Sequence, residues 1–251
     1  MNRLIRAEAL KLRTTRTFWA LTLGALGLVA IVVTAMSAAS NFTPGDHPAQ
    51  QALSLAGPAQ TFALLLGVLA VTSEFRYQTM TPALLTTPRR TPLLGAKLIT
   101  LAATGLILGL LAFAEAAAIV LSVLSARHIP SQASAAGVAG IIAGGAITTA
   151  LCAALGVGFG TLVRNQAGAI VAALGALYLA EPLLSVTPGA GAAVQRFGLG
   201  GLTSGASGTS GFPSSTHLLG QAPAALVLAS YVLALITAAA LLFRRRDLAV
   251  T

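Results

Sequence analysis

The feature that most constrains this chain is a series of six apolar runs, each nearly free of charge and most of them long enough to cross a bilayer. A membrane-spanning helix needs ~20 predominantly apolar residues. The second run is short and is interrupted late by Glu74, whereas the third and fourth are long enough to tilt or protrude. The sequence therefore predicts an all-α integral membrane protein with six transmembrane helices. These spans lie at about 18–39, 58–73, 98–124, 136–163, 167–185 and 222–243.

Charged residues are too scarce for a soluble fold. They make up 8% of the chain and apolar residues 56%, whereas soluble domains are about a quarter charged. The net charge of +9 would suit a nucleic-acid-binding protein if it gathered on one solvated face. Here the basic residues lie in short segments between the apolar runs, so we expect a lipid bilayer and no nucleic acid as partner. Cys152 is the single cysteine, which excludes a disulfide framework and a thiolate metal site.

The distribution of lysine and arginine predicts which side each connection faces. Cytoplasmic connections of membrane proteins carry the excess of these residues. With the N-terminus inside, 13 of the 15 basic residues fall on the inner side, and only Arg127 and Arg196 fall outside. We therefore expect both termini in the cytoplasm, with a leader helix at 1–17, a transmembrane domain at 18–243 and a basic tail at 244–251. A cleaved signal peptide is the alternative for the first run, but that run exceeds the ~7–15 apolar residues of a signal core.

The inner connection at 74–97 is longer than two antiparallel helices require. Thr81 and Pro82 predict a helix start, since a threonine cap followed by a first-turn proline is typical of one. Pro88 disfavours helical geometry at the residue before it and so ends this helix within two turns. The short helix would present two leucines to a cytoplasmic protein; the alternative is an ordinary interfacial loop with basic anchors. The candidate docking residues are Glu74, Arg76, Thr81, Pro82, Leu84, Leu85, Pro88, Arg89 and Arg90.

The sequence offers no motif for chemistry on this chain. It lacks the G-x-x-x-x-G-K-[ST] phosphate loop, the H-E-x-x-H zinc motif and paired His or Cys ligands. Gly205–Gly208 (GASG) resembles the G-x-S-G motif of rhomboid proteases. However, Ser207 lies in an expected outer loop, and its near histidine, His217, lies in the same loop. We therefore expect no enzyme activity and keep an intramembrane protease as a remote alternative.

Three segments together resemble bacterial ABC-2 type permeases. The leader Arg6–Trp19 (RAEALKLRTTRTFW) is similar to that of the family, as is the inner connection from Glu74 to Leu98 with its Leu84–Arg90 stretch (LLTTPRR). The closing Phe243–Leu248 (FRRRDL) also fits, and the six-helix plan covers the whole chain. Each motif is weak alone, but their order and topology together are specific.

The resemblance implies the membrane subunit of an ABC transporter, working as a dimer with two separate ATPase subunits. ATP and Mg would bind those subunits, and no cofactor would bind this chain. In the family, the connection after helix two carries a coupling helix that docks into the ATPase, and the leader lies along the membrane surface. Short re-entrant helices precede the last span; they would fall at 186–221, where the glycine content disfavours a well-formed helix.

Three acidic residues lie where apolar surroundings are expected. Glu8 falls on the apolar side of the leader helix, so we hypothesise that it meets a basic group on the ATPase or on the inner connection. Glu115 and Glu181 fall in the outer halves of helices three and five. A charged group in the bilayer is costly and usually faces a cavity or a partner. Both are therefore candidates for the substrate path, with a buried packing acid as the alternative.

These observations favour a permease subunit in the bacterial cell membrane that exports a hydrophobic or amphipathic, drug- or antibiotic-like compound. The subunit would form a dimer, either with a second copy of itself or with a homologous permease. A self-sufficient secondary transporter or channel is the alternative from a different class. It predicts inverted repeats and a polar constellation near the membrane midplane, and the sequence shows neither.

Overall fold

The computed structural model describes residues 2–40, 48–77, 90–163, 165–187, 189, 191–209 and 218–245. Every regular element within these ranges is a helix. The elements are α1 (Asn2–Thr14), α2 (Arg16–Ala39), α3 (Pro48–Ser54), α4 (Pro58–Arg76), α6 (Arg90–Ala126), α7 (Ala135–Leu162), α8 (Gln166–Gly175), the π-helical turn η1 (Ala176–Ala180), α9 (Glu181–Ser185), α10 (Gly191–Phe197), α11 (Leu199–Ser207) and α12 (Gln221–Arg245).

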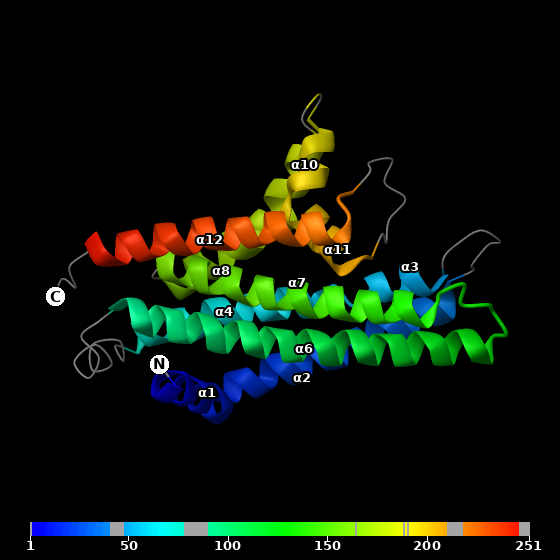
Figure 1. The fold of residues 1–251 in the computed structure, drawn as a ribbon, viewed down its shortest axis with the longest axis horizontal. Coiled ribbons are helices and arrows are strands. Elements are labelled where there is room, and N and C mark those ends of the chain that lie inside the picture. The colour runs from blue at the N-terminus through cyan, green and yellow to red at the C-terminus, as the bar shows by residue number, and fades with distance from the viewer. Residues whose placement is uncertain are drawn as a thin grey trace.

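Six helical spans in the described ranges are long and apolar enough to cross a membrane, which confirms the predicted six-helix plan (Figure 1). The second span is longer than predicted, because only a short turn at residues 55–57 separates α3 from α4. The spans are Arg16–Ala39, Pro48–Arg76, Pro92–Ala126, Ala135–Leu162, Gln166–Ser185 and Gln221–Leu242.

The connection predicted at 74–97 is shorter in the structure, and this part of the prediction is wrong. Glu74 and Arg76 belong to the end of α4, and α6 begins at Arg90 rather than at about residue 98. Both spans were predicted to end near the first charged residue. Glu and Lys are good helix formers, so the two helices continue through Glu74 and Lys97, which pair with each other.

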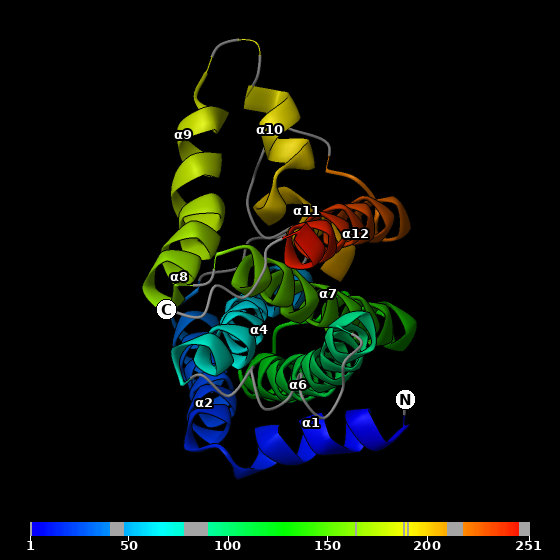
Figure 2. The ribbon, with the colours of Figure 1, turned by 90° about the vertical axis from the view of Figure 1, so that its left-hand side faces the viewer.

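The centre of the bundle consists of α4, α6 and α7, which lie side by side (Figure 1 and Figure 2). α12 packs against α7, and α2 packs against α6 and α4. α1 lies across one end of the bundle beside α6, as Figure 2 shows. We call this end the basic end: it holds α1, the end of α4, the start of α6 and the end of α12, all on the left of Figure 1.

Two short helices, α10 and α11, occupy the segment where re-entrant pieces were predicted. α8, η1 and α9 lean away from the bundle, and α10 and α11 return to it (Figure 2). α11 forms despite its glycines because the Glu181 carboxylate accepts hydrogen bonds from Gly200 N at 2.7 Å and Gly201 N at 3.1 Å. These bonds satisfy amides at the helix start, where no preceding carbonyl is available. Gly208, at φ +74°, ends the helix in the left-handed conformation.

Glycines bring α4 and α7 into close contact. Gly140–Gly144 and Gly156–Gly160 have the four-residue spacing of small residues that is typical of close packing between transmembrane helices. A Cβ atom at Gly156 would overlap the carbonyl oxygen of Leu64 in α4. A Cβ atom at Gly140 would meet nothing within 4 Å. The Gly156–Gly160 pair therefore forms a packing seam with α4, whereas a side chain at Gly140 would meet open space.

We predict that Gly156→Ala destabilises the protein by about 1–3 kcal/mol, because the added methyl group forces α4 and α7 apart. Thermal unfolding of the purified chain in detergent measures the change. Gly140→Ala is the matched control and should be neutral or slightly stabilising, since it adds the same methyl group in open space. Equal melting temperatures for the two variants would contradict the proposed seam.

Candidate functional site

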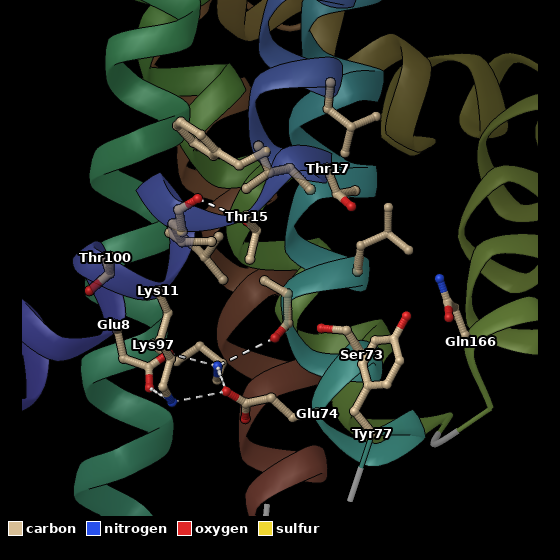
Figure 3. Close-up of a pocket in the computed structure, with 17 residues that line it drawn as sticks. Glu8, Lys11, Thr15, Thr17, Ser73, Glu74, Tyr77, Lys97, Thr100 and Gln166 are labelled. Atoms are coloured by element: carbon tan, nitrogen blue, oxygen red, sulfur yellow. Dashed lines mark hydrogen bonds and ion pairs between the residues drawn. The ribbon is translucent and has the colours of Figure 1, made fainter. Parts of the chain in front are cut away.

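Four charged side chains from three helices meet at the basic end, and we call them the ion network (Figure 3). The Lys97 ammonium lies 2.8 Å from Glu8 Oε2 and 2.9 Å from Glu74 Oε1. The Lys11 ammonium lies 2.8 Å from Glu8 Oε1 and 3.2 Å from Glu74 Oε1. The network therefore joins α1, which contributes Glu8 and Lys11, to α4 and α6. Its two carboxylates and two ammonium groups balance in charge.

Three of the four side chains are withdrawn from solvent. The exposed fraction of the side chain is 4% for Lys97, 6% for Glu8 and 11% for Glu74, but 50% for Lys11. Removing one partner of a buried pair leaves an uncompensated charge, which typically costs about 3–5 kcal/mol. Lys97 also points toward the Ala70 carbonyl at 3.4 Å. Lys97 is thus the centre of the network.

The two members of the ion network that belong to the leader, Glu8 and Lys11, are held in their ionised forms. Burial would raise the pKa of the Glu8 carboxyl, but the Lys97 and Lys11 ammonium groups together outweigh it and lower that pKa below its ordinary value. Burial would lower the pKa of Lys11, but the hydrogen bond to Glu8 and the charges of Glu74 and Glu8 raise it overall. The pKa shifts of Glu8 and Lys11 therefore both favour the charged forms that make the ion pairs.

The network explains why an acid lies on the apolar side of the leader. α1 is amphipathic, and Leu12 on the same side packs near the core cluster of Leu66, Val71 and Leu101. Glu8 is buried on that packed side and pairs with Lys97. Its basic partner was predicted on the ATPase or on the inner connection. Lys97 was counted in that connection, but it lies in α6.

A cavity of about 650 Å³ lies beside the ion network, between α1 and α2 on one side and α4 and α6 on the other. Figure 3 shows Ser73, Tyr77 and Gln166 gathered on the side away from α1. The described residues that line the cavity are Glu8, Lys11, Leu12, Thr15, Thr17, Phe18, Leu21, Leu66, Leu69, Ala70, Ser73, Glu74, Tyr77, Lys97, Thr100, Leu101 and Gln166.

The predicted docking residues are divided between described and undescribed parts of the chain. Glu74 belongs to the ion network. Arg76 donates a hydrogen bond to Gln166 Oε1 at 3.1 Å, which links the last residue of α4 to the first residue of α8. Arg90 is the first residue of α6. The remaining candidates lie outside the described residues and stay predictions: Thr81, Pro82, Leu84, Leu85, Pro88 and Arg89.

The other predicted acids lie away from the ion network. Both oxygens of Glu181 accept backbone hydrogen bonds from the start of α11, so this side chain positions a helix. Glu115 is partly buried in α6, and its Oε2 has no hydrogen-bond partner among the described residues. Ser207 is 1% exposed, and its hydroxyl is bonded to Ser204 O and Thr209 Oγ1. Its supposed histidine partner, His217, lies outside the described residues.

The sequence analysis did not recognise Lys11 and Lys97 as functional residues. The available signals were Lys11 three positions after Glu8, and a lysine at the edge of the third apolar run. Both signals also describe ordinary basic anchors at a membrane surface. Only the packing of α1 against α6 distinguishes the two possibilities.

Residues 4–178, more than half of the chain, match the family model of the ABC-2 family transporter proteins. The chain belongs to the ABC-2 family. This match confirms the resemblance drawn from the three sequence segments, two of which it covers. No curated protein matches the chain. As an ABC-2 family protein it is a transport subunit of the membrane, from a family that works with ABC ATPase subunits.

We predict that in this ABC-2 protein Lys97→Met releases the leader helix α1 from its packing against α4 and α6. In that variant Glu8 and Glu74 share only one cation, the half-exposed Lys11. The loss should be about 3–5 kcal/mol of stability in that region. Limited proteolysis with chymotrypsin, which cleaves after the leader leucines and whose sites neither variant removes, and thermal unfolding measure it. Arg13→Gln is the control, since Arg13 is exposed and makes no ion pair within the described part of the chain. Unchanged cleavage in Lys97→Met would contradict the role of the network.

Proposed function

We propose that this chain is the permease subunit of an ABC exporter for a hydrophobic or amphipathic compound, driven by ATP hydrolysis on separate subunits. The supporting observation is the ion network. α4 ends at Arg76 and α6 begins at Arg90, so the predicted coupling segment lies between these two helices. The pair of Glu74 and Lys97 connects the two helices that flank this segment. Glu8 connects the leader to α6, and Lys11 connects it to α4.

In this proposal the chain acts mechanically and catalyses no reaction. Closure of the ATPase subunits displaces the coupling segment, and the ion network makes α1, α4 and α6 move together. The glycine seam passes the movement of α4 to α7, because the two backbones are in direct contact. Packed helices have discrete arrangements, so such a displacement shifts the bundle between states and opens the path outward.

The proposed assembly follows from charge and family membership. The basic end faces the cytoplasm, because thirteen of the fifteen lysines and arginines then lie on the inner side. Two ATPase subunits carry ATP and Mg, and a second permease copy, identical or homologous, completes a dimer. The proposed location is the cell membrane of a bacterium. Drug- or antibiotic-like cargo is proposed from family membership, and Glu115 remains a candidate for its path.

The test of this proposal is the pair of substitutions Leu84→Asp and Leu85→Asp, which place charges on the proposed docking helix. We expect the ATPase subunit to be lost from the purified complex and ATP-dependent transport to fall to background, because a buried unpaired charge destabilises an apolar contact. Co-purification and transport into inverted vesicles measure both effects. Val186→Asp, an exposed site in the predicted outer segment, is the control.

Two results would contradict the proposal. In the first, the ATPase subunit stays bound and cargo still moves in the double variant. In the second, the purified wild-type chain transports without any ATPase subunit, as a secondary transporter or channel would.

A further inference from the structure

The cavity beside the ion network changes from polar to apolar along the bundle axis. In α4 its lining runs from Tyr77 and Ser73 at the basic end to Leu69 and Leu66 one to three turns further in. In α2 it runs from Thr17 to Leu21 in the same direction. A molecule that fits this lining has a polar head at the basic end and an apolar tail that points into the bilayer.

The polar end of the cavity presents a cation and hydroxyl groups. Lys11 is the half-exposed member of the ion network, and two of its three N–H donors are used by Glu8 and Glu74. The third donor remains for a ligand. The hydroxyl groups of Thr17 and Ser73 make no hydrogen bond within the described residues. Both Glu8 oxygens are occupied, and Glu74 Oε2 is buried, so the accessible charge is positive.

The surroundings of the cavity strengthen this positive charge. Arg6, Arg13 and Arg16 are exposed on or next to the leader, and the one acid of the leader, Glu8, is buried. Basic residues at the cytoplasmic surface attract anionic lipids, by about 1 kcal/mol for each lysine or arginine near the surface. The Trp19 indole, which is 48% exposed, lies at the start of α2, where aromatic residues are enriched at membrane interfaces.

We propose that this cavity is a binding site for an anionic phospholipid of the inner leaflet. The phosphate group accepts hydrogen bonds from Lys11 and Ser73, and an acyl chain lies along Leu21, Leu66 and Leu69. The lipid fills the space between the leader and α4 and fastens the leader next to the ion network. The proposal rests on the predicted orientation of the basic end, but it does not require an ATPase, a cargo or transport.

The test is native mass spectrometry of the full chain in detergent, titrated with palmitoyl-oleoyl phosphatidylglycerol or with the phosphatidylcholine of the same chains. We expect one phosphatidylglycerol to be retained per chain at least fivefold more strongly than phosphatidylcholine. Leu69→Trp and Leu21→Trp fill the cavity from opposite walls and should each abolish this retained lipid. Leu65→Trp is the matched control, since Leu65 lies on α4 outside the cavity lining.

A second pair of variants tests the role of the cation. Lys11→Gln should lower phosphatidylglycerol retention about fivefold, the effect of one basic residue near a membrane surface. Arg196→Gln removes the same charge from α10, which lies away from the leader and from the cavity lining (Figure 2), and should change it less than twofold. Lys97 keeps both carboxylates paired in Lys11→Gln, so the leader stays attached.

Three outcomes would overturn the proposal. Wild type could bind the two lipids equally. Both cavity-filling variants could retain phosphatidylglycerol as the wild type does, which would place the lipid elsewhere on the bundle. Finally, uncharged dodecanol could displace the bound lipid as well as phosphatidylglycerol does, which would make the cavity a site for apolar cargo. Because none of these measurements uses ATP, their failure is separate from failure of the proposed transport function.

Discussion

The buried ion pair between Glu8 and Lys97 is the interaction on which the basic end of this protein depends. Glu8 Oε2 of the leader helix α1 lies 2.8 Å from Lys97 Nζ of the long helix α6. Both side chains are almost completely withdrawn from solvent. Neither charge would be stable there alone, because an unpaired buried charge costs several kcal/mol. The leader therefore docks in one register only, the one that brings Glu8 to Lys97.

The rest of the bundle is held by contacts of other kinds. In the membrane, apolar surface gives little drive for helices to associate, so close backbone packing and hydrogen bonds must supply it. The Gly156–Gly160 seam supplies the packing between α4 and α7. Glu181 supplies hydrogen bonds that fasten α11. The ion network thus joins the leader to α4 and α6, and the seam joins α4 to α7.

The sequence was sufficient to predict the six spans, because long apolar runs have no other stable place than a bilayer. The resemblance to the family implied short helices before α12, whereas the glycine content of 186–221 disfavoured them. The sequence was not sufficient to place the ends of α4 and α6, because Glu74 and Lys97 resemble loop residues until their pairing is known. Glu181 was predicted in the outer half of a span, yet its partners are backbone amides of a glycine-rich segment, which side-chain patterns do not reveal.

The central claim is that Glu8 and Lys97 fasten the leader by their opposite charges. Exchanging the charges tests it most directly, with thermal unfolding of Glu8→Lys, Lys97→Glu and the double variant. Each single variant unbalances the network by two charges, turns two of its four ion pairs into like-charge contacts and should lower the melting temperature. The double variant restores the charge balance and the attraction between positions 8 and 97, but it places like charges beside Lys11 and Glu74. Its loss should therefore be smaller than the sum of the two single losses, without full recovery. A double variant as unstable as the sum of the two single variants would contradict the account.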